Sequence, residues 1–269
     1  MTVENVFCDK ACVVTGGGSG IGFALAQALL DRGARVLIAG HDHGALRAAS
    51  EKLAGTGRRI AWHRADVSDA DDVEELINAA VNRFGRVDYM FSNAGVSGTL
   101  PINDATLDHW RRLLDVNLWG VIHCVHYVLP VMRRQGSGHI VNTASASGLV
   151  PLPGQALNNT SKYAVVGLSE SLRLELAPDG IKVTAVCPGP VASDIWAKSI
   201  AGGRTDRHAP AGALTPRSHG EIDFEGRRTW TRHLGVSGQT AGGWRMYRWF
   251  PRLAERALRA AARRSKTAD

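Results

Sequence analysis

Short apolar runs alternate along the chain with longer stretches in which apolar residues recur every three or four positions. Runs of this kind are typical of β-strands, and the longer stretches are typical of amphipathic helices. Strand-like runs cover Ala11–Thr15, Arg35–Ala39, Arg59–Arg64, Val87–Phe91, His139–Thr143 and Ile181–Cys187, and the clearest helical stretches are 68–84, 104–134 and 156–177. This alternation predicts βαβ units and a doubly wound parallel sheet, a three-layer α/β/α Rossmann fold.

The pattern fades after Pro190, so the sequence divides into three parts. Residues 1–195 form the expected Rossmann core, and residues 196–243, rich in Gly, Arg, Thr and His, are expected to form a substrate lid over the carboxyl ends of the strands. Residues 244–269 form a basic tail. A seventh strand is expected after Gly203, but it has the weakest signal because no apolar run indicates it.

Composition narrows the class of protein. With 269 residues, 44% hydrophobic and 21% charged, the chain fits one α/β domain. No run approaches 18 consecutive apolar residues and the first residues hold no apolar leader, so we expect neither a membrane span nor a signal peptide. The four scattered cysteines indicate no disulfide framework and no metal site, which favours a cytoplasmic protein.

The net charge of +7 lies in one segment. Between Trp244 and Lys266 there are eight basic residues and one acidic residue, and the rest of the chain holds 24 of each. The body is therefore neutral, which argues against a nucleic-acid partner. From Pro251 the tail forms a basic amphipathic helix, which could lie on an anionic membrane or pack on its own body or a partner subunit. Its alanine-rich apolar side favours packing.

A glycine-rich turn follows the first strand. The segment Thr15–Gly22 reads T-G-G-G-S-G-I-G and leads directly into a helix. Glycines in this place allow a tight turn and let the first N–H groups of the helix approach a pyrophosphate.

The turn and five later motifs resemble the short-chain dehydrogenase/reductase family over about residues 7–195. The pattern T-G-x-x-x-G-x-G is accompanied in order by Asp66-Val67, Ser92-Asn93-Ala94-Gly95, Asn117, Ser145 with Lys162, and Pro188-Gly189. The resemblance implies NAD(P)-dependent hydride transfer between a nicotinamide and a ketone or secondary alcohol. It also implies a homodimer or homotetramer that assembles through the stretches 104–134 and 156–177.

The same resemblance implies a set of cofactor contacts and a set of catalytic residues. The cofactor contacts are Gly16, Ser19, Gly20, Ile21, Gly22, His41, Asp66, Val67, Asn93, Ala94, Gly95, Lys162, Pro188, Gly189 and Val191. The catalytic positions are Asn117, Ser145, Asn158 and Lys162.

The end of the second strand bears on the choice between NAD and NADP. Gly40 stands where an acid would accept hydrogen bonds from the ribose of NAD, and His41 stands where a basic residue would meet the 2′-phosphate of NADP. Ser19 replaces a second basic residue of NADP-type members, so the basic pair is incomplete. We expect NADP to be preferred, with NAD as the alternative. His41 could also be an exposed loop histidine that does not contact the cofactor.

One position departs from the family pattern. The family has Tyr-x-x-x-Lys on one helix face, but the residue four before Lys162 is Asn158. Asn158 also lies 13 residues after Ser145, the family's spacing from serine to tyrosine. Tyr163 points about 100° away around the helix and cannot substitute. We expect Asn158 within hydrogen-bond reach of Ser145.

This departure leaves three hypotheses open. In the family the tyrosine gives a proton to the carbonyl oxygen, lysine lowers its pKa, serine orients the oxygen and asparagine anchors a water. An asparagine amide exchanges no proton near neutral pH, and losing a general acid costs about 10²–10⁴ in rate. The chain could be a carbonyl reductase with another acid (water, Lys162 or the substrate), a redox-neutral isomerase, dehydratase or cyclase, or an inactivated variant or cofactor-binding pseudoenzyme.

The expected substrate is a hydrophobic ketone or alcohol. Trp196 in the lid would form one apolar wall, and Pro151–Gln155 the opposite wall, with Gln155 and Ser145 near the substrate. Trp196 could equally be a packing residue beneath the lid.

Overall fold

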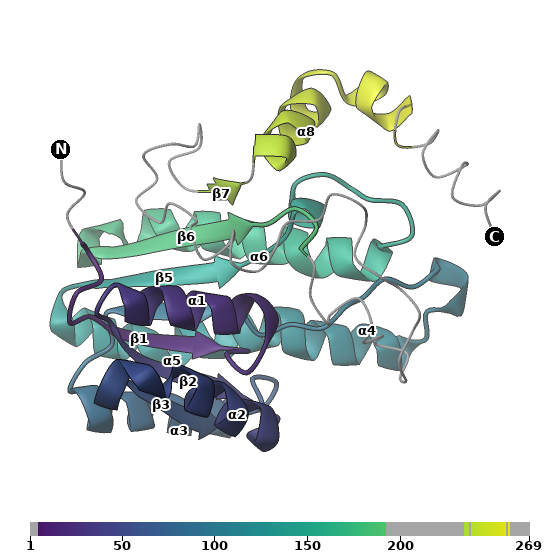
Figure 1. Cartoon of the computed structure of the whole chain (residues 1–269). Helices are drawn as coiled ribbons and strands as arrows, with labels where there is room; N and C mark the ends of the chain where they lie inside the picture. Colours follow the sequence, from purple (N-terminus) through teal and green to yellow (C-terminus); the bar gives the residue numbers. More distant parts are fainter. Residues whose placement is uncertain (1–4, 192–233, 237, 257, 259–269) are drawn as a thin grey trace.

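The computed structural model describes residues 5–191, 234–236, 238–256 and 258. Seven parallel strands form one sheet in the order β3-β2-β1-β4-β5-β6-β7 (Figure 1), which confirms the doubly wound fold. The strands are β1 (Ala11–Thr15), β2 (Arg35–Gly40), β3 (Ile60–Arg64), β4 (Tyr89–Ser92), β5 (Gly138–Thr143), β6 (Ile181–Cys187) and β7 (Leu234–Val236).

Helices cover both faces of the sheet. They are α1 (Gly20–Asp31), α2 (His43–Leu53), α3 (Ala70–Phe84), α4 (Leu107–Leu114), α5 (Gly120–Gln135), α6 (Ala156–Glu175) and α8 (Gly238–Trp249). Alternate residues of β1 face opposite sides, as the strand period requires. Cys12 and Val14 join the core beneath α1 and α2, whereas Ala11 and Val13 join the core beneath α3 and α5.

The order of the strands in the sheet reverses between β1 and β4, and this place is where a ligand site is expected. β1 pairs with β2 on one side and β4 on the other, and Val14 is in register with both Ile38 and Phe91. The connections from β1 and β4 leave in opposite directions here, and in doubly wound folds this reversal marks the ligand-binding crevice, at the carboxyl ends of the two strands.

The expected helix over 104–134 begins at Leu107, where Thr106 forms a capping box with His109, and runs through a π-helical segment at Asp115–Trp119 into α5. By length and apolar composition, residues 107–135 would suffice to cross a membrane. In the structure Cys124, Val128 and Met132 of α5 are buried in the same core cluster as Val13 and Met90 of the sheet.

The region after β6 is described only in part. β7 pairs in parallel with β6, so the expected seventh strand is present. Most of the expected lid, including Trp196, lies outside the described residues. All four cysteines are free thiols. Within the described part of the chain, no three His, Cys, Asp or Glu residues gather into a set that could hold a metal ion.

Candidate functional site

The glycine turn after β1 is shaped by close backbone approach. Gly16 has φ +67°, and a Cβ on Gly22 would collide with the Gly16 carbonyl. Ser19, the N-cap of α1, makes no side-chain cap hydrogen bond, which leaves the first N–H groups of the 12-residue helix for another acceptor. A glycine-rich turn below free helical N–H groups fits the pyrophosphate of a dinucleotide.

The loop after β4 is fastened to this turn by hydrogen bonds from Thr15. Its hydroxyl accepts from the backbone N–H of Asn93 (2.9 Å) and of Ala94 (3.0 Å), and donates to the Phe91 carbonyl (3.3 Å). The Asn93 side-chain amide donates to the Thr15 carbonyl at 3.0 Å. Residues 93–95 are thereby held beside the crevice.

At the ends of β2 and β3, the two aspartates are engaged locally. Asp42 is the N-cap of α2, and its carboxylate accepts from the Ala45 N–H at 3.0 Å. Asp66, which precedes Val67 at the start of the loop after β3, accepts from the N–H (3.0 Å) and hydroxyl (2.7 Å) of Ser68. Burial raises the pKa of Asp66, but the Ser68 hydrogen bonds and the charges of His41 and Arg64 outweigh it and hold the pKa below its usual value.

Asn117 is fully buried in the π-helical segment and clamps the β4 loop. Its Oδ1 accepts from the Val96 N–H at 2.8 Å, and its Nδ2 donates to the Val96 carbonyl at 3.0 Å. Nδ2 also lies 3.5 Å from the Ser161 hydroxyl of α6. The Asn117 side chain therefore joins the β4 loop to α6. The sequence had suggested only that this asparagine anchors a water.

Lys162 is a buried cation on α6. Its Nζ donates to the Thr143 carbonyl at the end of β5 (3.0 Å) and lies beside Gly95. Burial lowers the pKa of Lys162 to about 8, while the nearby Cys187 acts in the opposite direction. The ammonium group is thus held at the junction of β4, β5 and α6.

Asn158 lies one turn before Lys162, but its partner differs from the expectation. Its Nδ2 donates to the Ser147 hydroxyl at 2.8 Å and to Gln155 Oε1 at 3.3 Å. The expected direct contact with Ser145 is wrong for the described conformation. Ser145 Oγ instead accepts from the Ser147 N–H at 3.2 Å and so caps a 3₁₀ turn over Ala146–Gly148.

Ser147 is the residue that sequence reasoning missed. The turn brings the Ser147 hydroxyl close to α6, so the Asn158 side chain reaches this hydroxyl. The only signal in the sequence was a second serine two places after Ser145.

The remaining predicted residues lie at the same edge of the sheet or outside the described part. Pro188 follows β6 and its carbonyl accepts from the Ala146 N–H at 2.7 Å. Gly189 comes next, and Val191 is buried. Gln155 is half-buried at the start of α6, and His41 is exposed after β2.

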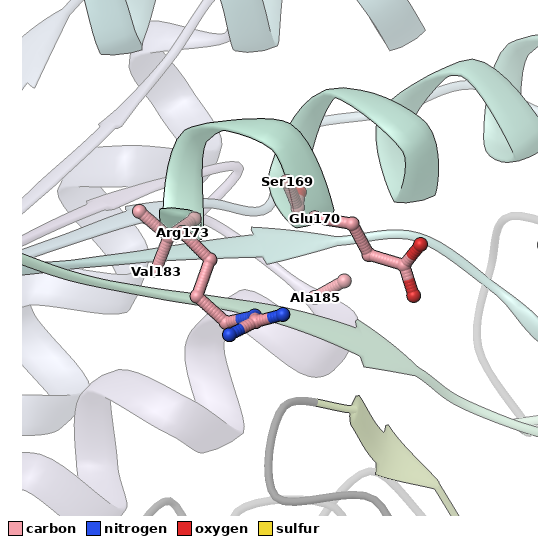
Figure 2. Close-up of a pocket in the computed structure, with 5 residues that line it drawn as sticks. All are labelled: Ser169, Glu170, Arg173, Val183 and Ala185. Carbon is pink, nitrogen blue, oxygen red and sulfur yellow. The ribbon is translucent and has the colours of Figure 1, made fainter. Parts of the chain in front are cut away.

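A hollow between α6 and β6 is separate from this edge. Figure 2 shows its lining, in which the Glu170 and Arg173 side chains extend from α6. Lys162 lies seven residues, or about 10 Å of helix, before the first lining residue. The lining residues are Ser169, Glu170, Arg173, Val183 and Ala185.

Comparisons with known proteins agree with this arrangement. The family model described as short chain dehydrogenase matches residues 10–202. A Staphylococcus aureus protein described as an uncharacterized oxidoreductase is 37% identical over 192 residues, 71% of this chain and 82% of that protein. A Staphylococcus epidermidis protein with the same description is 34% identical over 183 residues, 68% of this chain and 78% of that protein.

Two solved structures are also similar. A short chain dehydrogenase/reductase from Burkholderia phymatum in complex with NAD superposes with a TM-score of 0.82 at 29% identity, covering 92% of this chain and 95% of that one. An NAD⁺-bound xylitol dehydrogenase gives a TM-score of 0.67 at 35% identity, covering 69% of this chain and 72% of that one. On the family match and these relatives, the chain belongs to the short-chain dehydrogenase family of oxidoreductases.

Proposed function

We propose that this chain is an NAD(P)-dependent reductase of hydrophobic ketones, or the reverse dehydrogenase, in which Asn158 occupies the place of the family's catalytic tyrosine. The observation that carries the proposal is the placement of Asn158 and Lys162 one turn apart on α6, facing the Ser145–Ser147 turn and the β5 end. When bound, the nicotinamide supplies or accepts the hydride. The glycine turn, residues 93–95 and Lys162 would hold the dinucleotide.

The serine turn would orient the substrate oxygen. The hydroxyls of Ser145 and Ser147 both lie in the turn next to α6, and a hydroxyl can donate to a carbonyl oxygen or accept from an alcohol. The Asn158 amide can also donate a hydrogen bond, but it cannot give up a proton near neutral pH. Asn158 would therefore position the oxygen without serving as the acid.

Lys162 is the proton source that the site supports best. Its ammonium group is buried beside Gly95 one turn from Asn158, and burial lowers its pKa to about 8, which makes it a stronger acid than an ordinary lysine. It remains protonated at neutral pH. Because a tyrosine acid usually contributes about 10²–10⁴ in rate, we expect slow reduction.

The finer cofactor proposal is a preference for NADP. Three features support it: Gly40 offers no carboxylate, Asp42 already caps α2, and the exposed Arg64 is in register with Gly40, the residue before His41. Positive charge at this edge favours a 2′-phosphate over a free ribose hydroxyl.

The substrate class and assembly remain proposals that rest on family membership. The half-buried stretch Pro151–Leu152 and Gln155 would form one wall of a site for a hydrophobic ketone. A homodimer or homotetramer through α4, α5 and α6 is the proposed assembly, and a small-molecule substrate is the proposed partner.

The test is a pair of substitutions at one position. Asn158→Tyr is expected to raise NADPH-dependent reduction across a panel of hydrophobic ketones by at least about tenfold, because it supplies a general acid. Asn158→Phe has the same ring without the hydroxyl and is expected to give no such gain. NADPH binding, measured by nicotinamide fluorescence, should be retained in both variants.

The other outcomes are equally informative. An equal gain in both variants would show that position 158 supplies no acid. A native redox-neutral reaction that both variants abolish would favour the isomerase, dehydratase or cyclase hypothesis. NADPH binding without turnover in any of the three proteins would favour a cofactor-binding pseudoenzyme, and a chain that binds neither NADPH nor NADH would refute the proposed function.

A further inference from the structure

Helix α8 and the short helical segment after it, residues 251–256, present large apolar side chains to solvent. Met246, Trp249, Phe250 and Leu253, here called the α8 stripe, are 41%, 74%, 64% and 60% exposed. Met246 and Trp249 lie on α8, Phe250 follows at its end, and Leu253 lies in the helical segment that begins at Pro251. Phe250 N–H donates to the Met246 carbonyl (2.8 Å) at the end of α8, and Ala254 N–H donates to the Phe250 carbonyl (3.1 Å) in the segment that follows.

The other side of the same segment is anchored to the body. Trp244 packs against the core cluster that includes Val165 of α6 and Cys187 of β6, and Ala254 is buried. Figure 1 shows α8, in yellow, beyond the β6–β7 edge and projecting away from the sheet. The packing of Trp244 and Ala254 thus turns the α8 stripe outward.

Arginines flank the stripe. Arg245, Arg248, Arg252 and Arg256 are exposed, against one acid, Glu255, between Trp244 and Arg256. The guanidinium of Arg248 lies 5.7 Å from the centre of the Trp244 ring, which holds this positive charge near the helix. The chain outside residues 244–266 is neutral, so this segment carries the net charge.

We propose that the α8 stripe and its arginines form a docking surface for an anionic phospholipid bilayer. Exposed tryptophan and phenylalanine side chains with arginines beside them match the two parts of a bilayer surface, the acyl boundary and the anionic headgroups. A second copy of this chain fits less well, because two such faces would bring like charges together.

Of the alanines after Trp244, the structure describes Ala254, which is buried. The exposed apolar side chains of the described segment include the large ones at 246, 249, 250 and 253. The surface would hold the enzyme at a membrane, into which hydrophobic ketones partition. This link to the substrate rests on the proposed function, whereas lipid binding itself does not.

The experiment uses the full chain and sedimentation with vesicles. Vesicles of phosphatidylcholine and phosphatidylglycerol at about 3:1 are compared with pure phosphatidylcholine at about 0.1 M salt. We expect binding to the anionic vesicles that weakens as salt rises, and binding at least about tenfold weaker for the Trp249→Ser/Phe250→Ser variant. Ile102→Ser, which removes a comparably exposed apolar side chain (57%) from the 3₁₀ turn over Ile102–Asp104, is the matched control and should bind as the native chain does.

Three results would overturn the proposal. They are no binding to anionic vesicles, equal binding to both kinds of vesicle, and unchanged binding of the double variant. A double variant that binds normally but has a smaller mass in solution by light scattering would identify a second copy as the occupant. Circular dichroism and NADPH binding verify that the variants are folded, and vesicle binding by a protein without reductase activity would leave this inference standing while the proposed function fails.

Discussion

The two halves of the candidate site are held by different hydrogen bonds. In the cofactor half, formed by β1 to β4, Thr15 ties Asn93 and Ala94 to the glycine turn, and Asp66 is hydrogen-bonded to Ser68. Thr15, Asn93, Ala94 and Asp66 belong to motifs that the sequence had marked. In the catalytic half, formed by β5 and α6, Asn158 binds Ser147, a residue that the sequence had not marked.

The difference implies that cofactor binding and proton transfer can be separated in this protein. The cofactor half has the backbone shape that a dinucleotide requires, whereas the catalytic half has hydroxyls and a buried ammonium without a phenol at position 158. Damage to the first half should abolish binding. Changes at Ser145, Ser147 or Asn158 in the second half should alter rate and pH dependence and leave binding largely intact.

The largest expected effect comes from the glycine turn. Gly22→Val places a side chain against the Gly16 carbonyl and the Asn93 amide, so the turn must open. Because overpacking costs about 1–3 kcal/mol, we expect NADPH affinity to fall by about tenfold to 100-fold, measured by fluorescence titration. Gly55→Val, at an exposed glycine with open space around its Cα, is the control and should bind NADPH normally.

A smaller effect is expected at the end of β2. Gly40→Asp adds a carboxylate at a position where a Cβ has ordinary contacts, 3.7 Å from Leu46. A carboxylate accepts hydrogen bonds from ribose hydroxyls and repels a 2′-phosphate, so the ratio of NADPH to NADH affinity should fall by about tenfold. An unchanged ratio would show that this edge does not read the ribose.

The smallest expected effect is the pH dependence of stability through Lys162. Its pKa is about 8 in the folded protein and 10.5 as a free side chain, so between these values the unfolded chain binds more protons than the folded one. Stability should therefore rise as pH increases from 8 to 10.5, by on the order of 2 kcal/mol.

Urea unfolding of the native chain and of Lys162→Met tests this sign. The variant should lack the rise between pH 8 and 10.5, whereas Lys52→Met, at an exposed position of α2, should retain it. The same titration should reduce the rate of ketone reduction above about pH 8, because the Lys162 ammonium loses the proton that we propose it donates.

Local pattern was sufficient to predict the fold. Period-2 and period-3.6 spacing of apolar residues predicts strands and helices because side-chain direction repeats along each element. The alternation of these elements predicts a parallel sheet, since a crossover between parallel strands needs a helix. The seventh strand was weakly marked because β7 spans only three residues, Leu234–Val236, which is too short for a period to show.

The sequence by itself determined which motif follows which strand, and it located the glycine turn and the positive charge. It also determined that Asn158 and Lys162 lie one helical turn apart. Only the tertiary structure decided that Asn158 binds Ser147, that Asp42 caps α2, that burial weakens Lys162 as a base, and that α8 turns its large apolar side chains outward. The physical reason is range. Backbone periodicity is set by neighbouring residues, whereas burial and the choice among possible hydrogen-bond partners depend on elements that are distant in the chain and meet only when the sheet and helices pack.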